Sequence, residues 1–95
     1  MSYELEIAEE AIDDLHVLVE SIPSSRRVDA IEGIKSRLLD LATNPIGIPR
    51  LHYGRPTYLF QFVVEGTRYY WGATFCYSHD ETSIIITSIF RASAL

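Results

Sequence analysis

The chain has 95 residues, of which 47% are hydrophobic and 22% are charged, a composition that predicts one globular domain over residues 1–95. No apolar run approaches the ~18 residues that a membrane helix needs, and the Met1–Glu4 start lacks the basic and apolar regions of a secretory signal. A single cysteine, Cys76, has no partner for an internal disulfide, as expected of a cytoplasmic protein. Because no membrane helix is expected, we also expect no membrane partner.

The charge is unevenly distributed along the chain. The net charge is −5, with ten acidic and four basic side chains in residues 1–48 against three acidic and four basic ones in residues 49–95. Such an acidic chain is a poor general binder of nucleic acid, so a polyanionic partner would need a local arginine patch. No Cys/His cluster has metal-ligand spacing and no Gly-rich phosphate loop occurs, so we expect neither a metal nor another cofactor.

The first half of the sequence predicts one strand and two helices. Residues 3–7 alternate between apolar and acidic side chains, as in a half-buried strand. Apolar residues then recur at three- and four-residue steps, which predicts one helix on either side of Pro23. The predicted buried stripes are Ala8, Ile12, Leu15, Val19 and Ile22 in the first helix, and Val28, Ile31, Ile34, Leu38 and Leu41 in the second.

The second half has strand composition throughout. Residues 58–64, 67–77 and 83–90 are rich in aromatic and β-branched residues and are separated by turns at Glu65-Gly66 and at residues 78–81. The predicted order is β-α-α-β-β-β, an α+β fold in which two helices pack on one face of a four-stranded sheet. The other face is then partly open, and an activity would reside there.

Alternation along residues 67–77 assigns Tyr69 and Trp71 to the core and Arg68 and Tyr70 to the open face. The last strand ends at Arg91, and an antiparallel pairing of the two strands would bring Arg91 beside Arg68 on one shared face. A pair of guanidinium groups suits a bound phosphate or an acidic partner. The alternative for Arg68 is a solvated charge at a sheet edge or a partner for a nearby carboxylate, and the alternative for Arg91 is a solvated charge at the end of a strand.

Four stretches, in this order, resemble the RelE/ParE superfamily of bacterial toxins from type II toxin–antitoxin pairs: residues 3–15, 38–45, 65–71 and 85–91. The resemblance covers nearly the whole chain. It implies two N-terminal helices on a mainly antiparallel, twisted, four-stranded sheet, with the first strand beside the last. It also implies a cognate antitoxin protein as partner.

In the RelE-like branch, the resemblance implies a ribosome-dependent mRNA endoribonuclease that inhibits translation, in which a ribose 2′-hydroxyl attacks the adjacent phosphate. Arg68 and Arg91 match the family's arginines after the hairpin turn and at the end of the last strand, and are the expected catalytic residues. The expected RNA-binding residues are Arg50, His52, Arg55 and Tyr70. Of these, His52 or Tyr70 would replace the acid/base residue that the family carries near its C-terminus.

The sequence also departs from the RelE pattern. The chain is acidic, residues 58–64 carry no basic side chain, and the C-terminal residues 92–95 contain no tyrosine or histidine. Two alternatives therefore stay open. One is a ParE-like toxin that inhibits DNA gyrase by binding, and the other is a non-catalytic relative that acts only through protein–protein contacts.

Overall fold

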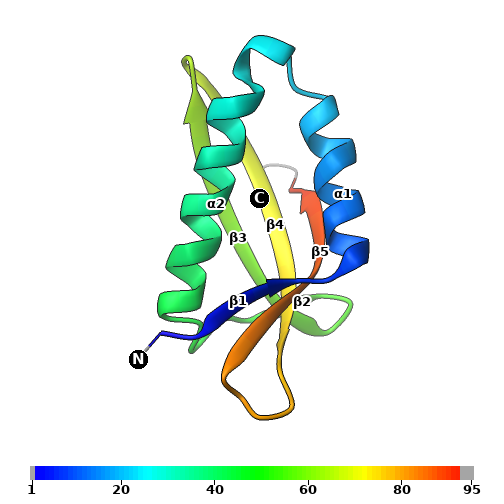
Figure 1. The fold of residues 1–95 in the computed structure, drawn as a ribbon, viewed down its shortest axis with the longest axis vertical. Coiled ribbons are helices and arrows are strands. Elements are labelled where there is room, and N and C mark those ends of the chain that lie inside the picture. The colour runs from blue at the N-terminus through cyan, green and yellow to red at the C-terminus, as the bar shows by residue number, and fades with distance from the viewer. Residues whose placement is uncertain (1, 93–95) are drawn as a thin grey trace.

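The structure, a computed structural model, describes residues 2–92. It contains two long helices and five strands, shown in Figure 1. In chain order they are β1 (Glu4–Ile7), α1 (Glu9–Glu20), a 3₁₀ turn (Ser24–Arg26), α2 (Arg27–Thr43), β2 (Arg50–His52), β3 (Arg55–Val64), β4 (Thr67–Tyr77) and β5 (Ser83–Arg91). None of the described helices is long and apolar enough to cross a membrane.

The strands form one sheet in the order β1-β5-β4-β3-β2. β1 pairs with β5 in parallel, and the other neighbours pair antiparallel. The predicted α+β class and the position of the first strand beside the last are confirmed. The parallel neighbour and the helices together enclose the Ile84–Ile86 segment, which explains why this stretch of β5 is almost wholly apolar.

The prediction of four strands was wrong by one, because the loop before residue 55 contains a short hairpin. His52 pairs with Arg55 across a two-residue turn in which Tyr53 and Gly54 have φ angles of 53° and 70°. Two successive positive φ angles give a turn whose twist matches that of the paired strands. The result is β2, an edge strand that extends the sheet beside β3.

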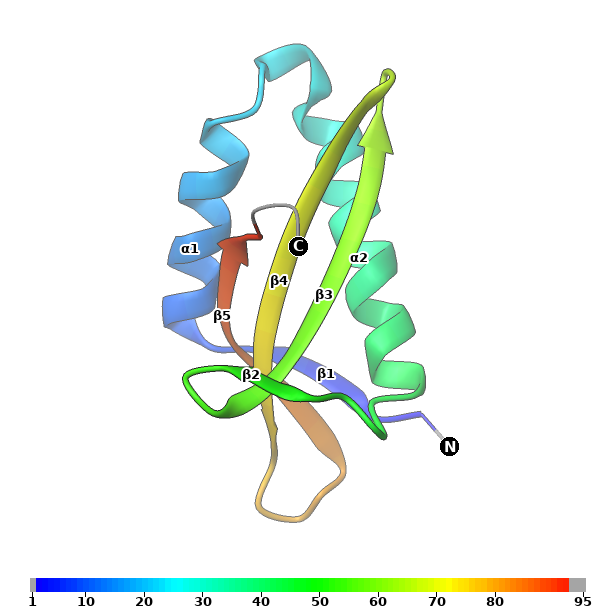
Figure 2. The ribbon, with the colours of Figure 1, turned by 180° about the vertical axis from the view of Figure 1, so that it is seen from behind.

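Both helices lie on the same face of the sheet, and Figure 2 shows the opposite face without a helical cover. α1 packs chiefly on β5 and α2 on β3. Trp71, Ala73 and Phe75 of β4 are buried beneath them, as the alternation predicted.

The predicted helix stripes were wrong in part. Val28, Ile31 and Ile12 are 73%, 44% and 39% exposed, whereas Ala11 and Ala30 are fully buried. Small residues occupy the places of closest approach between helix and sheet: a Cβ atom added to Gly33 would lie 3.2 Å from Cδ2 of Phe62. The buried stripe is therefore set by small residues that a count of large apolar side chains overlooks.

Candidate functional site

The open face of the sheet carries the second set of alternating side chains. On β4 this set comprises Arg68, Tyr70, Gly72, Thr74 and Cys76. Strands β2 to β5 contain no aspartate or glutamate, and the acidic residues of this half lie in the turns that join them. On the open face, strand-borne carboxylates are therefore confined to the edge strand β1, where Glu4 and Glu6 alternate with the core-facing Leu5 and Ile7.

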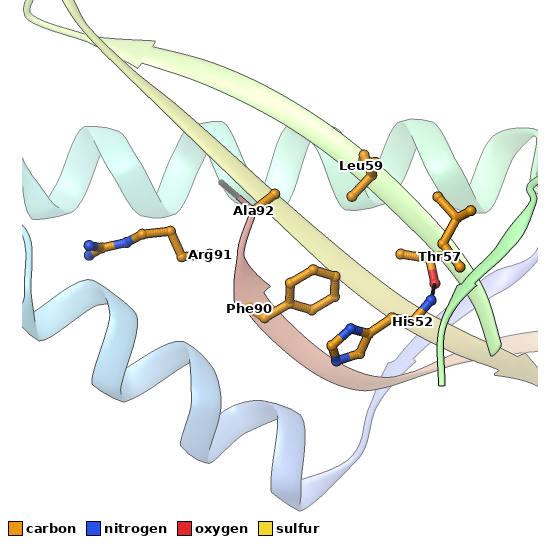
Figure 3. A pocket seen from close by; sticks show the side chains of 7 residues that line it. His52, Thr57, Leu59, Phe90, Arg91 and Ala92 are labelled. Carbon is orange, nitrogen blue, oxygen red and sulfur yellow. Dashed lines mark hydrogen bonds between the residues drawn. The ribbon is translucent and has the colours of Figure 1, made fainter. Parts of the chain in front are cut away.

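A pocket of about 500 Å³ opens on this face near β2. Its lining residues are Leu51, His52, Thr57, Leu59, Phe90, Arg91 and Ala92 (Figure 3). The His52 imidazole stacks on the Phe90 ring, with centroids 4.2 Å apart and an interplanar angle of 15°. The backbone N–H of His52 donates to Oγ1 of Thr57 over 2.9 Å, which holds β2 against the start of β3.

Gly72 determines where the Phe90 ring lies. The two residues pair across β4 and β5, and a Cβ atom at Gly72 would lie 2.5 Å from Cζ of Phe90 and 3.0 Å from Cδ2 of Leu59. Carbon atoms in contact are ordinarily 3.5–4.0 Å apart. The ring therefore occupies the space that any larger side chain at position 72 would fill, and it lies across β4 as the base of the His52 stack.

Arg91 does not share the open face with Arg68, so that prediction was wrong. Arg91 pairs with Trp71, and directly paired residues point to the same side of a sheet. Its Nη2 donates to Oγ of Ser21 at the end of α1, over 3.0 Å. Figure 3 shows the Arg91 side chain extending away from His52 and Phe90. Arg68 lies three positions before Trp71 and therefore points to the opposite face.

The error has a physical origin in β5. Sequence alternation correctly grouped Arg91 with Ile89, but Ile89 is buried beneath the helices. A bulge between Thr74 and Phe75, opposite Ser88 and Ile86, leaves Thr87 without a direct partner. Because of this bulge, the β4 partner of Arg91 cannot be found by counting residues along β5 from the pairs that precede the bulge.

The other predicted residues lie along or beside the open face. Tyr70 is 42% exposed and pairs with Gln61. Tyr70 and Arg68 follow the pocket along β4, two and four residues from Gly72, which is roughly 7 and 13 Å along the strand. At the opposite end, Arg55 begins β3 and is exposed.

The guanidinium of Arg50 is held locally, because its Nη1 donates to the Gly54 carbonyl oxygen over 3.3 Å. The pocket residues Thr57, Leu59 and Phe90, and Gly72 beneath the Phe90 ring, were not predicted. The pairing of Gly72 with Phe90 could have indicated them, had the register been known. Within residues 2–92, no three His, Cys, Asp or Glu side chains are grouped so that they could hold a metal ion.

No family model matches the sequence, and no curated protein matches it either. Among solved structures, the chain is similar to a variant of the Escherichia coli toxin RelE in the free state, in which two arginines are replaced by alanine. The TM-score is 0.58 at 19% identity, over 98% of this chain and 86% of that chain. The chain has the RelE fold. At this identity the likeness extends to the fold, and the RelE-like resemblance read from the sequence is confirmed at that level.

Proposed function

We propose that this protein is the toxin of a type II toxin–antitoxin pair and that it cleaves mRNA on the ribosome, in the cytoplasm. The observation that carries the proposal is the open face of a RelE-like sheet, where Arg68, Tyr70 and His52 lie on strands that contain no carboxylate. A polyanion can approach the part of this face formed by β2 to β4, because the acidic side chains lie on β1 at the far edge of the sheet, on the helices and in the turns.

The reaction needs three chemical roles. A base removes the proton from the ribose 2′-hydroxyl, the resulting oxygen attacks the adjacent phosphorus, and an acid protonates the 5′-oxygen that leaves. A cation stabilises the charge on the equatorial phosphate oxygens. Arg68 suits the last role, since its planar guanidinium donates two parallel hydrogen bonds to a phosphate. Tyr70, two residues from Arg68 on the same face, suits proton transfer at that phosphate. His52 stacks on Phe90 over Gly72, roughly 13 Å along β4 from Arg68, and is too distant to act there.

Arg50 and Arg55, at the β2–β3 end of the sheet, would contact phosphates that flank the cleaved bond. The guanidinium of Arg91 would take no part in the reaction, because it donates to Ser21 at the end of α1, although Arg91 also borders the pocket. A cognate antitoxin would neutralise the protein by covering the open face or the helices.

A second candidate function is inhibition of DNA gyrase by binding, as in ParE-like toxins. The position of Arg91 favours it, because one of the two expected phosphate-binding arginines is missing from the open face. The apolar lining of the pocket suits a protein partner as well.

The test is an assay of mRNA cleavage on ribosomes programmed with a defined message, run beside a gyrase supercoiling assay with the same preparation. The proposal predicts new 5′ ends within the codon of the decoding site and unchanged supercoiling. Intact mRNA with inhibited supercoiling would establish the second function instead. Intact mRNA with unchanged supercoiling would contradict both. Expression with the neighbouring genes tests the antitoxin, which should co-purify as a small companion protein.

A further inference from the structure

We propose that the pocket beside His52 and Phe90 binds one unpaired nucleobase of the RNA. The inference deepens the proposed function and rests on it, because that function supplies RNA as the ligand. It assigns different parts of the open face to different parts of a nucleotide, with the base in the pocket and a neighbouring phosphate at Arg68.

The shape and chemistry of the pocket suit a flat aromatic ligand. Figure 3 shows the His52–Phe90 pair on one side of the pocket and Thr57 and Leu59 on the other. The volume of about 500 Å³ falls within the range of small-molecule sites. Stacking on aromatic side chains is the usual way in which proteins hold bases of single-stranded nucleic acid, since every base has a π-face.

The polar groups of the pocket leave the imidazole available for a base edge. Oγ1 of Thr57 is already used twice, since it accepts from the backbone N–H of His52 and donates to the Arg55 carbonyl oxygen. Within residues 2–92, neither imidazole nitrogen of His52 has a hydrogen-bond partner. An imidazole nitrogen can donate to or accept from a base edge, which adds direction to the stacking.

The surrounding charge favours a nucleotide over a protein side chain. Arg68 lies roughly 13 Å along β4 from Gly72, and a flexible RNA segment can span that distance from the base in the pocket to a phosphate at its guanidinium. An aromatic side chain of a protein partner would use the pocket but not the arginine. Charge complementarity with a polyanion therefore selects RNA as the occupant.

The experiment is an NMR titration of the full chain with adenosine 5′-monophosphate and, as a matched control without a base, ribose 5-phosphate. We expect the adenosine nucleotide to shift the signals of His52, Leu59 and Phe90, and ribose 5-phosphate to leave them in place. Phe90→Leu should weaken nucleotide binding by roughly tenfold, the scale of losing one aromatic stacking partner. Phe90→Tyr retains the ring and should bind as the wild type does. Val63→Leu, on the same face but outside the pocket, is the matched control and should also bind normally.

Equal shifts with both compounds would reduce the site to phosphate binding and overturn the inference. Nucleotide binding that is as tight in Phe90→Leu as in the wild type would overturn it as well. The inference would also be overturned if the nucleotide left the signals of the pocket residues unchanged while added gyrase or antitoxin shifted them. Failure of the proposed function is distinguishable: intact mRNA on programmed ribosomes, together with base-dependent shifts in the pocket, would refute cleavage and retain the base site.

Discussion

Replacing Gly72 by alanine should displace Phe90 and separate it from His52. The added Cβ would lie 2.5 Å from Cζ of Phe90, so the ring must move by about 1 Å to reach an ordinary carbon–carbon contact. Overpacking of this kind costs about 1–3 kcal/mol, and alanine regains roughly 0.5–1 kcal/mol of the conformational cost of glycine in a strand. The expected net loss is about 1 kcal/mol, or a fall in Tm of roughly 4–8 °C for a domain of this size.

Thermal unfolding followed by circular dichroism gives the Tm, and the NMR chemical shifts of the His52 ring protons report the loss of the stacked neighbour. The double variant Gly72→Ala/Phe90→Leu is the control, because a shorter side chain at position 90 relieves the contact. The alanine should therefore cost less stability there than in the wild-type background. A Gly72→Ala protein with an unchanged or higher Tm and unmoved His52 signals would refute this account of the pocket.

Further outcomes follow from the fold and the β4–β5 turn. Ile34 is 2% exposed, so Ile34→Ala should lower the free energy of unfolding by about 2–5 kcal/mol in a denaturant titration. Val28 is 73% exposed, so Val28→Ala should change it by less than about 0.5 kcal/mol. Equal losses in the two variants would contradict the assignment of the buried face of α2. The hydroxyl groups of Ser78 and Thr82 and the Thr82 N–H donate to the Asp80 carboxylate and lower its pKa below the ordinary value. Its contribution to stability should be complete above the pKa of an unfolded aspartate and disappear as the pH falls through the lowered folded-state value. Carboxyl-carbon NMR titration, with Asp80→Asn as the stability control, checks this, and an unshifted titration would contradict it.

The sequence predicted those features of the fold that depend on local pattern. The period change at Ala8 marked the end of β1, and Glu65-Gly66 marked the β3–β4 hairpin, where both residues have positive φ angles of 50° and 81°. Alternation placed Trp71 in the core. Each of these signals lies within a few residues of the element that it defines.

Features that depend on register between distant elements were not accessible in this way. The partner of Arg91 is fixed by the pairing of β4 with β5, including a bulge that no local signal marks. The pocket depends on Phe90 lying over Gly72, eighteen positions earlier in the chain, and on β2 placing His52 against that ring. The same reason applies to α2, whose buried face is set by its contact with Phe62.

In the proposed function, Arg68 acts on the RNA and Arg91 does not. The most direct measurement compares single-turnover rates of mRNA cleavage on programmed ribosomes for the wild type, Arg68→Ala and Arg91→Ala. Because Arg68 lies on the open face and Arg91 donates to Ser21 on the helix side, Arg68→Ala should lower the rate on the order of 10²-fold or more, the scale of losing one charge-stabilising donor, with its Tm unchanged. Arg91→Ala should retain a rate near that of the wild type. Equal loss of rate in both folded variants, or loss in Arg91→Ala alone, would contradict the account.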